Sequence, residues 1–467
     1  MLEAVNVVVA LLAFAPVPTQ AATQELEPIW TRQLEQRIEW VAAAGDSTSP
    51  ALLVCTSTAA LLVIEPETGR TRFSTAVQAG PGVRLAQGEG GDTVYCYDRF
   101  SAYALTLRES PAARHAAGPL LWQAGEWALP PAGYRGDPEF LTRVVTGHAT
   151  PSALLVARSD GRVALLAREN GHVQWDCRLP RLPDCRLHVS GKVAALVFKV
   201  PRRDSRHSGR EAGQLRAAFF ELDNDHPQPV VRTLGDTWPI WTKLIPNQRL
   251  VAVWPESVVI AEPTAPLFNF RADVGGPLRA SAIDVYAPSE PDPGALAERS
   301  SSEQSALLVT AGAERLSAYD PSTGESVWSD EAGQQPAALV TSLRVHDDMV
   351  IATTPRSFEV RRAASGEVVG EHVAEESARL VAATVVGDFG YALFRGPASE
   401  ETTEREESLM LTRVALPPPY RRPPATQALP RATQFRLDHS EPIRQALWVG
   451  RRLVLVEQKR LRAYTLP

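Results

Sequence analysis

Cysteine and histidine are the residue types in this 467-residue chain best suited to chemistry, and the spacing of the cysteines gives catalysis little support. The four cysteines are Cys55, Cys96, Cys177 and Cys185, and no two form an adjacent or C-x-x-C pair. Zinc binding and thioredoxin-type redox chemistry are therefore not indicated. Cys177 and Cys185 flank a short loop that a disulfide would close in an oxidising compartment, and two unpaired buried thiols are the alternative. Cys55 and Cys96 fall in mid-strand positions and are interpreted as small core residues.

The nine histidines are scattered, and none forms an H-x-x-x-H or H-E-x-x-H pair. The densest polar cluster is V-H-D-D-M-V at 345–350, where His346 could act as a base held by a carboxylate. An ordinary turn between two strands is the favoured interpretation. No G-x-S-x-G, G-x-G-x-x-G or phosphate-binding loop occurs. The sequence thus predicts no catalytic, cofactor-binding or metal-binding residue, and a protein that is not an enzyme.

Charge and hydropathy patterning exclude further classes of function. The net charge of -6 gives no basic excess for nucleic acid or an anionic membrane. Residues 4–15 are apolar except Asn6, and small residues near 19–21 suit cleavage by a signal peptidase. The segment 1–21 is therefore predicted to be a signal peptide. It departs from the usual pattern because it carries Glu3 and no Lys or Arg before the apolar run. A buried strand or helix is the alternative. No later run is long enough to span a bilayer, so we expect a periplasmic or secreted protein with no membrane span in its mature chain.

The elements that would position any site come from a repeat, best preserved in L-S-A-Y-D-P-S-T-G-E-S-V-W at 316–328. Its pattern A-x-D-x-x-T-G-x-x-x-W is formed by Ala318, Asp320, Thr323, Gly324 and Trp328. Partial copies carry Gly69 with Phe73, Gly171 with Trp175, and Gly366 with no aromatic residue. The glycines lie in steps near 51 residues with one near 42, and a period of about 40 to 50 residues with several short strands is typical of a β-propeller.

Each unit has two short runs rich in Val, Leu and Ala joined by a polar turn. Nearly continuous apolar runs suit strands covered on both faces by neighbouring blades. The glycine permits the positive φ of the turn, the Asp320 side chain can accept backbone N–H groups there, and Trp328 can pack between blades. These residues are therefore interpreted as structural parts of a blade.

The two ends of the chain predict how the ring closes. The chain stops at R-L-R-A-Y-T-L-P, just where the D-x-x-T-G turn would begin, and residues 26–34 offer the missing outer strand with its tryptophan. We therefore expect one all-β domain over 22–467, a single closed β-propeller of four-stranded antiparallel blades that leaves no open edge around the circle.

The repeat resembles the tryptophan-docking motif of the PQQ-type, or quinoprotein-like, β-propellers, a family that includes quinoprotein alcohol dehydrogenases and the assembly factor BamB. The resemblance implies eight blades, the family norm, whereas nine hairpin units can be counted in the sequence. The dehydrogenases carry an adjacent cysteine pair and a calcium site, and neither can be aligned to this chain. A periplasmic PQQ-dependent oxidoreductase is therefore the alternative hypothesis, and no cofactor is expected.

Function is assigned to loops, because blades act as scaffold. The insertion 201–213 and the insertion 395–408 each join the second and third strands of a blade, so both emerge on one face, one basic and one acidic. Solvated insertions are the alternative to a protein-docking face with charge-steered specificity. The predicted protein-binding residues are Arg202, Arg203, Arg206, Arg210, Glu400, Glu401, Glu404, Glu406 and Glu407. The sequence thus favours a monomeric, non-catalytic, extracytoplasmic scaffold that binds other proteins, with a role in envelope assembly by analogy of fold alone.

Overall fold

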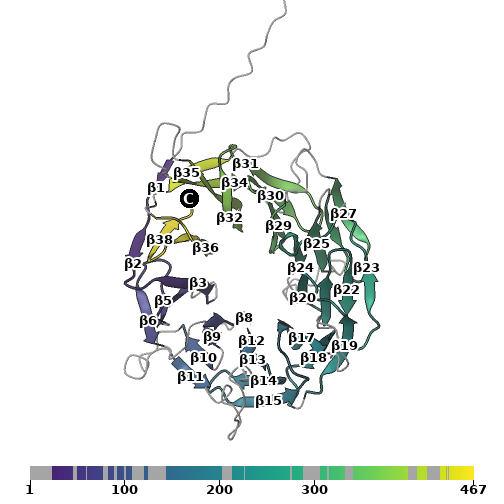
Figure 1. Ribbon diagram of the computed structural model, residues 1–467. Coiled ribbons are helices and arrows are strands. Elements are labelled where there is room, and N and C mark those ends of the chain that lie inside the picture. Colours follow the sequence, from purple (N-terminus) through teal and green to yellow (C-terminus); the bar gives the residue numbers. More distant parts are fainter. Residues whose placement is uncertain are drawn as a thin grey trace, which may run out of the picture.

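The computed structural model is an all-β ring of small twisted sheets arranged in a circle (Figure 1). The region enclosed by the innermost strands is called the central channel below. The structure describes residues 24–45, 50–58, 60–76, 83–88, 92–98, 101–107, 120–124, 144–201, 213–225, 227–273, 276–287, 306–312, 315–331, 340–397, 407–417, 432–437, 439 and 441–467. The region 1–21 predicted to be a signal peptide lies outside these residues. The described residues form nine sheets, which confirms the predicted propeller and agrees with the nine units counted in the sequence rather than the eight of the family norm.

The blades are numbered in chain order, and their strands are given from the channel outward. Blade 1 contains β3 (Ile38–Ala44), β4 (Ala51–Thr56), β5 (Ala60–Ile64) and β6 (Thr71–Ala76). Blade 2 contains β7 (Arg84–Leu85), β9 (Thr93–Tyr97), β10 (Ala102–Thr106) and β11 (Leu120–Ala124). Blade 3 contains β12 (Val144–Ala149), β13 (Ala153–Arg158), β14 (Arg162–Ala167) and β15 (Val173–Arg178).

The next three blades follow the same antiparallel order. Blade 4 contains β16 (Cys185–Ser190), β17 (Val193–Pro201), β18 (Gly213–Glu221) and β19 (Val230–Gly235). Blade 5 contains β20 (Trp241–Ile245), β21 (Arg249–Val253), β22 (Val258–Ala261) and β23 (Phe268–Phe270). Blade 6 contains β24 (Ile283–Tyr286), preceded by the short 3₁₀ helix η3 (Ala280–Ala282), and β25 (Leu307–Ala311), β26 (Arg315–Tyr319) and β27 (Ser326–Glu331).

The last three blades complete the circle. Blade 7 contains β28 (Ser342–His346), β29 (Met349–Thr353), β30 (Ser357–Arg362) and β31 (Val368–Val373). Blade 8 contains β32 (Arg379–Val386), β33 (Phe389–Pro397), β34 (Glu407–Ala415) and β35 (Thr433–Leu437). Blade 9 contains β36 (Gln445–Val449), β37 (Arg452–Val456) and β38 (Arg460–Thr465), with β2 (Trp30–Gln33) as its outer strand.

The ring is closed by strands from opposite ends of the chain. β2 pairs antiparallel with β38, with Trp30 opposite Ala463. The backbone N–H of Leu34 donates to the Lys459 carbonyl at 2.8 Å, which extends the contact beyond β2. Blade 9 therefore consists of three C-terminal strands and one N-terminal strand, so the two ends of the chain are held together within one sheet.

Two further strands add to completed blades by parallel pairing. β1 (Gln24–Leu26) lies along the outer edge of blade 8 beside β35, and β8 (Gln87–Gly88) lies along the channel edge of blade 3 beside β12. Both free edges of a blade can thus accept an extra strand, because the unpaired N–H and C=O groups of an edge strand remain available.

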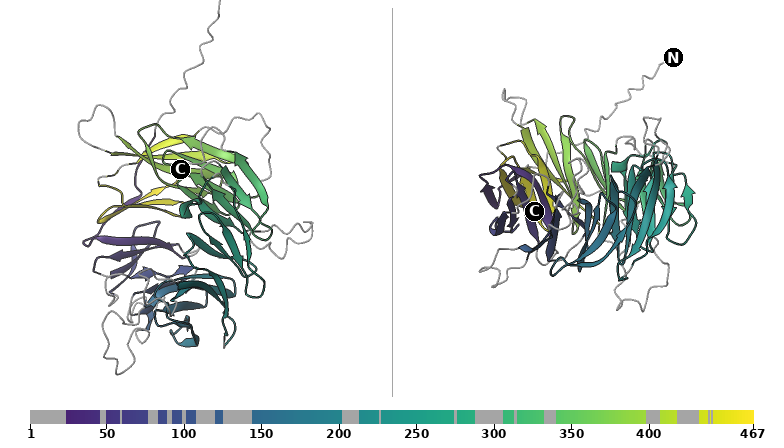
Figure 2. Two further views of the ribbon diagram at one scale, coloured as in Figure 1. Left: turned by 45° about the vertical axis from the view of Figure 1, so that its right-hand side comes forward. Right: turned by 60° about the horizontal axis from the view of Figure 1, so that its bottom comes forward.

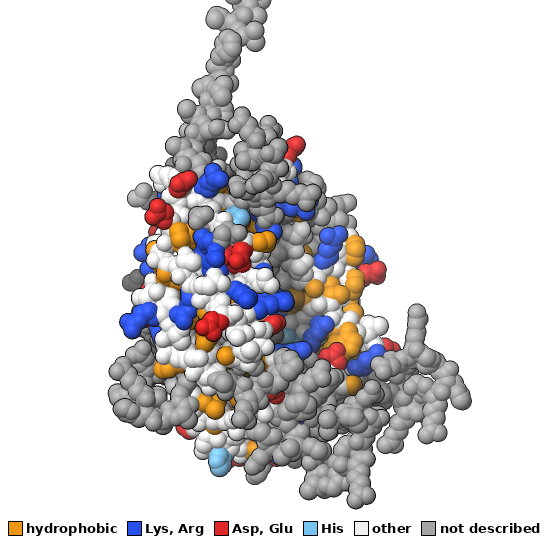
Figure 3. Space-filling view, turned by 60° about the vertical axis from the view of Figure 1, so that its left-hand side comes forward, with side chains coloured by type: hydrophobic (Ala, Val, Ile, Leu, Met, Phe, Trp, Pro, Cys, Tyr) orange, Lys and Arg blue, Asp and Glu red, His pale blue; other side chains and the backbone are white. Residues whose placement is uncertain are grey.

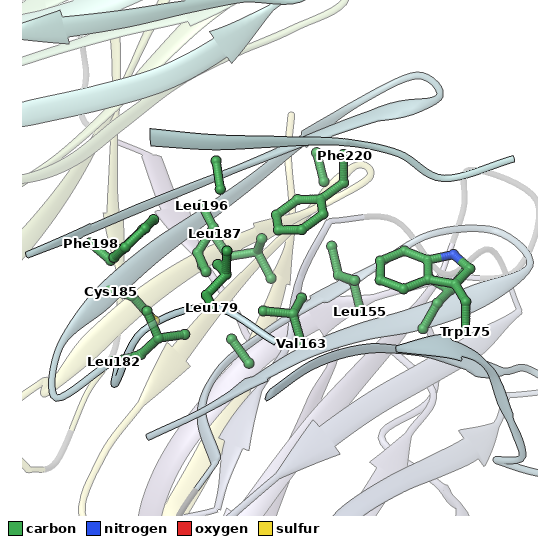
Figure 4. Packing of buried hydrophobic residues seen from close by; sticks show 14 of the residues in the cluster. Leu155, Val163, Trp175, Leu179, Leu182, Cys185, Leu187, Leu196, Phe198 and Phe220 are labelled. Carbon is green, nitrogen blue, oxygen red and sulfur yellow. The ribbon is translucent and has the colours of Figure 1, made fainter. Parts of the chain in front are cut away.

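The hydrophobic core is divided into clusters that lie between adjacent blades. One cluster joins blades 3 and 4 and includes Leu155, Trp175, Leu187 and Phe220, which converge from the two sheets (Figure 4). The middle strands are covered on both faces, so β4 and β13 are buried along their whole length. This explains the nearly continuous apolar runs of the sequence, since a blade has no solvent-facing side at its centre.

An aromatic side chain from each of several outer strands packs against a turn of the following blade. The rings of Trp30, Trp122 and Trp328 lie against Gly69, Gly171 and Gly366, which have φ near +70°. A Cβ atom at Gly366 would fall 2.6 Å from Trp328 Cδ2. Only glycine tolerates both the left-handed backbone and this close approach. These contacts join blade 9 to blade 1, blade 2 to blade 3, and blade 6 to blade 7.

Each of these tryptophans also donates its indole N–H to a backbone carbonyl of the same turn. The acceptors are Pro66, Arg168 and Ala363, at 2.8, 2.7 and 2.7 Å. The motif of one repeat is therefore divided between two joints. Trp328 meets Gly366 of the next blade, whereas Gly324, four residues before Trp328, receives Phe270 of the preceding blade.

Other joints use different side chains at the same place. Trp175 of blade 3 stacks on Phe220, with ring centroids 6.1 Å apart, and donates to the Leu222 carbonyl at 3.4 Å. Phe73 of blade 1 packs against the cluster that it shares with blade 2. Between blades 4 and 5 the guanidinium of Arg232 donates to the carbonyls of Glu262 and Pro263. The Arg232 guanidinium thus donates to backbone carbonyls at this joint, as the indole N–H of a tryptophan does at other joints.

The turn at 320–324 is organised as the sequence predicted. Asp320 Oδ1 accepts the backbone N–H of Ser322 at 2.7 Å, and the N–H of Gly324 donates to the Asp320 carbonyl at 2.7 Å. Thr323 Oγ1 accepts the N–H of Glu325 at 3.2 Å. Ala318 is buried opposite Trp328 in the ladder between β26 and β27. All of these residues stabilise the blade, and none faces the channel cavity described below.

Candidate functional site

The strands run across the thickness of the ring, so the tips of their hairpins lie at its two faces (Figure 2). In blades 4 and 8 the hairpins between strands two and three are longer than in the other blades. Their strands β17, β18, β33 and β34 each have nine residues, and pairing continues to Pro201 opposite Gly213 and to Pro397 opposite Glu407.

The corresponding strands of the other seven blades have four to six residues. The two long hairpins extend on the same face of the ring, and they are four blades apart in a circle of nine. They therefore lie almost across the channel from one another. This face is called the hairpin face below.

The charged residues predicted to bind protein belong to the tips of these two hairpins. Arg202, Arg203, Arg206 and Arg210 fall between β17 and β18, and Glu400, Glu401, Glu404 and Glu406 fall between β33 and β34; these eight residues lie outside the described residues. Glu407 is the first residue of β34, with its backbone opposite Pro397. The structure thus fixes the strands from which both loops emerge, and the binding role stays a prediction.

Cys177 and Cys185 are both free thiols in the structure, so the disulfide considered from the sequence is not formed. Cys177 lies on the outermost strand of blade 3 and Cys185 on the innermost strand of blade 4. With strands about 4.8 Å apart, three inter-strand spacings separate these radial positions. That exceeds the reach of a disulfide, whose Cα atoms lie within about 7 Å. Both side chains instead pack in the cluster between the two blades, where burial raises the pKa of the Cys177 thiol to about 11.

The remaining candidates from the sequence are structural. Cys55 and Cys96 are buried in the cluster between blades 1 and 2. His346 ends β28 in a tight turn to β29, where Asp347 has a φ of 51°. The imidazole of His346 is exposed and lies 3.8 Å from the Asp347 carboxylate, so the ordinary turn favoured by the sequence is confirmed. Within the described ranges no three His, Cys, Asp or Glu side chains are placed to share a metal ion.

The wall of the central channel carries polar side chains that sequence analysis did not single out. His188 on β16 contacts Thr242 on β20, with 2.8 Å between Nε2 and Oγ1. Lys243 on β20 donates to Asp284 on β24 at 2.9 Å, and the other Asp284 oxygen accepts the backbone N–H of Val345 on β28 at 2.8 Å. A belt of polar contacts thus links the innermost strands of blades 4 to 7, each residue bonding to the next blade.

Burial, with His148, Arg186 and Lys243 nearby, lowers the pKa of His188 to about 4. A histidine of the unfolded chain titrates near pH 6.5. Between these pH values the imidazole is protonated in the unfolded state and neutral in the folded state. The contribution of neutral His188 to the free energy of unfolding is therefore fully present above about pH 6.5 and is lost as the pH drops toward 4. We expect a loss of up to about 3 kcal/mol across this window, because each pKa unit is worth about 1.4 kcal/mol.

Urea denaturation at several pH values between 4.5 and 7.5 checks this expectation. His188→Gln retains a hydrogen-bonding group near Thr242 and lacks the titration, so its midpoint should vary less with pH than that of the unmodified protein. His346→Gln, a change at the exposed turn, is the matched control and should leave the pH dependence unaltered. Equal pH dependence in His188→Gln and the unmodified protein would show that His188 does not carry the effect.

A second feature of the channel wall is a cavity of about 630 Å³ beside blades 7, 8 and 9. It is lined by residues of the innermost strands β28, β32 and β36 and by the end of β29. The lining includes two exposed arginines, Arg344 and Arg444, the hydroxyl groups of Thr353 and Thr384, and the ring of Trp448. This region is called the channel cavity below.

The channel cavity escaped sequence analysis because its residues come from three blades and share no motif. The signal that the sequence did carry was local, namely Arg344 between Leu343 and Val345 in blade 7, and Arg444 and Gln445 directly before the apolar residues of β36 in blade 9. By contrast, the outer side of the ring at blades 9 and 1 shows Lys and Arg interspersed with Asp and Glu (Figure 3). That side of the ring therefore carries charged side chains of both signs rather than a patch of one sign.

The nine sheets, the closing strand and the tryptophan joints define the fold of the chain as a β-propeller. Residues 279–389, from the start of blade 6 into blade 8, match the family model described as outer membrane protein assembly factor BamB. The match includes the complete motif at 316–328 and confirms the resemblance found in the sequence. No curated protein sequence matches the chain.

Solved structures with a similar arrangement are distant in sequence. BamB from Moraxella catarrhalis is 11% identical, covers 94% of this chain and 99% of its own, and has a TM-score of 0.38. The WD40 domain of SCAP from fission yeast is 11% identical, with coverage of 94% and 98% and a TM-score of 0.47. Quinohemoprotein alcohol dehydrogenase from Comamonas testosteroni is 12% identical, with coverage of 80% and 73% and a TM-score of 0.42. Across the described residues no helix is long and apolar enough to cross a membrane.

Proposed function

We propose that this protein is a non-catalytic β-propeller scaffold that acts outside the cytoplasm and binds other proteins through the hairpin face. The observation that carries the proposal is the pair of long hairpins in blades 4 and 8, whose strands have nine residues each. Their paired strands extend further than those of the other hairpins on one face and end nearly opposite one another across the channel. In the sequence, the segment that follows one pair is rich in arginine and the segment that follows the other is rich in glutamate.

Such a face suits recognition of a partner whose own charge distribution has two poles. Loops placed by a rigid scaffold are the usual location of binding residues. Opposite charges at the two sides of the channel mouth would orient an approaching protein and exclude one with the reverse polarity, since electrostatic complementarity governs encounter rate and specificity. The match of 279–389 to the BamB family model supports a role in the cell envelope. This support is an analogy, since fold alone does not determine function.

Site-directed photocrosslinking tests the docking face. A photoreactive residue in place of Ser205, in the basic loop, is expected to capture a defined partner. The same residue in place of Lys192, on the opposite face of blade 4, is the matched control and should not. Replacement of Arg202, Arg203, Arg206 and Arg210 by serine should reduce capture several-fold, and capture should weaken as salt rises from 0.05 to 0.5 M. Equal capture at both positions, or capture that ignores the arginines, would contradict the proposal.

The other parts of the proposal have separate tests. Addition of PQQ and calcium to the purified protein should give neither bound-cofactor absorbance nor alcohol-dependent dye reduction, whereas the competing oxidoreductase hypothesis requires both.

The location is tested with a phosphatase that is active only after export. A fusion of residues 1–30 to this phosphatase should be active, and a fusion that lacks residues 1–23 and begins at residue 24 should be inactive. Cytoplasmic retention of the first fusion would contradict the location.

A further inference from the structure

The innermost strand of blade 8 has an open edge on the channel cavity. β32 is the last strand of its sheet, in the order β1-β35-β34-β33-β32, and its eight residues make it the longest of the first strands. In the described part of the chain, no strand pairs with its channel side. The start of this edge is already occupied, because the N–H of Leu380 donates to the Pro355 carbonyl at 2.7 Å, and Val381 is a bulge residue that is 36% exposed. From Ala382 onward, alternate residues of β32 direct their N–H and C=O groups away from β33 and into the channel.

The same molecule shows that a channel edge can accept an added strand. In blade 3 the short strand β8 pairs in parallel with the innermost strand β12, placing Gln87 opposite His148 and Gly88 opposite Ala149. The channel of this nine-bladed ring is thus wide enough for a fifth strand at the inner end of a blade. Blade 8 offers the equivalent edge over 382–386, where no strand pairs with it among the described residues, and the cavity of about 630 Å³ lies beside it.

The side chains around the cavity select the chemistry of an added strand. Arg344 of blade 7 and Arg444 of blade 9 line it from the two sides of β32, and both are exposed. Arg444 uses one N–H for the Ile38 carbonyl at 2.5 Å. The cavity lining contains no Asp or Glu. All of these features favour an anion.

We propose that the channel edge of β32 binds an extended acidic peptide as a fifth strand of blade 8, held by Arg344 and Arg444. Backbone pairing with β32 would supply affinity, and carboxylates on the two faces of the added strand would reach the two arginines. Because successive side chains of a strand point to opposite faces, two adjacent acidic residues fit this arrangement. The proposal rests on the protein-binding role proposed above and assigns a second surface to it.

Fluorescence anisotropy with the full-length protein and a labelled peptide Ser-Val-Thr-Glu-Glu-Val-Thr-Ser tests the proposal. We expect saturable binding that the Gln-Gln version of the peptide reduces about tenfold and that N-methylation of alternate residues abolishes. Arg344→Gln should weaken binding about fivefold, consistent with the loss of one partly exposed ion pair. Arg178→Gln removes the same charge from the exposed outer strand of blade 3 and should change nothing.

Hydrogen exchange locates the peptide. Binding should slow exchange at 379–386 and leave the outer strand β35 unaffected. Equal affinity for the Glu-Glu and Gln-Gln peptides, undiminished binding of the N-methylated peptide, or protection confined to another blade would overturn the proposal. The photocrosslink at Ser205 reports separately on the hairpin face. If the peptide binds but no partner is captured at Ser205, the proposed function is contradicted. If a partner is captured at Ser205 but the peptide does not bind, only the assignment of β32 is contradicted.

Discussion

Gly366→Ala is expected to lower the free energy of unfolding by about 3 kcal/mol. Gly366 has a φ of +72°, and a Cβ atom there would lie 2.6 and 2.7 Å from two atoms of the Trp328 ring. The left-handed backbone costs an alanine about 1–2 kcal/mol, and the overlap with a well-packed ring costs a further 1–3 kcal/mol. The ring cannot move away easily, because its N–H is bonded to the Ala363 carbonyl at 2.7 Å.

Gly387→Ala separates these two causes. Gly387 has a φ of +57°, and no atom lies within 4 Å of its ideal Cβ position, so alanine there meets the backbone cost without the overlap. We therefore expect Gly366→Ala to be less stable than Gly387→Ala by about 2 kcal/mol. Urea denaturation of the two variants, followed by tryptophan fluorescence, measures the difference. If both variants lose the same stability, the close contact between Trp328 and Gly366 contributes nothing.

Trp30→Ala is expected to lower the stability by about 4 kcal/mol and to open the ring. The change removes a ring packed on Gly69 and a hydrogen bond to the Pro66 carbonyl at 2.8 Å. Loss of a packed tryptophan costs about 3–5 kcal/mol and loss of the hydrogen bond about 1 kcal/mol, reduced here because Trp30 is half-buried. Trp30 also belongs to β2, whose pairing with β38 closes the circle.

Trp328→Ala is the matched control, because Trp328 makes the same contacts at a joint inside the ring. Both variants should lose similar stability, but only Trp30→Ala should release its strand. β27, which carries Trp328, directly follows β26 of its own blade in the chain, whereas β2 joins the other three strands of the last blade by pairing alone. Hydrogen exchange at 30–33 should therefore rise in Trp30→Ala, and exchange at 326–331 should stay slow in Trp328→Ala. Slow exchange in both variants would show that Trp30 is not needed to hold β2 in place.

The positions of the charged loops could be predicted from the sequence, and the channel cavity could not. The arginines of 202–210 and the glutamates of 400–407 are each contiguous in the chain, and the hairpins that bear them are recognisable from apolar runs on either side. Arg344 and Arg444 are 100 positions apart, the first within β28 and the second directly before β36, and neither belongs to a recognisable motif. Only the ring geometry places both beside β32.

The sequence by itself determined the blade, because the blade is local. Short apolar runs, a turn glycine and the D-x-x-T-G turn lie within a few tens of residues, so their hydrogen bonds and backbone angles follow from neighbouring residue types. The tertiary structure decided everything that depends on which blade lies beside which. It decided between the nine hairpin units counted in the sequence and the eight blades of the family norm, placed Trp328 on Gly366 rather than beside its own Gly324, and brought Arg232 to the carbonyls that an indole contacts at other joints. Each blade contacts its neighbours through surfaces that are similar from one repeat to the next. Which side chains meet at a given joint is therefore fixed only when the whole ring closes.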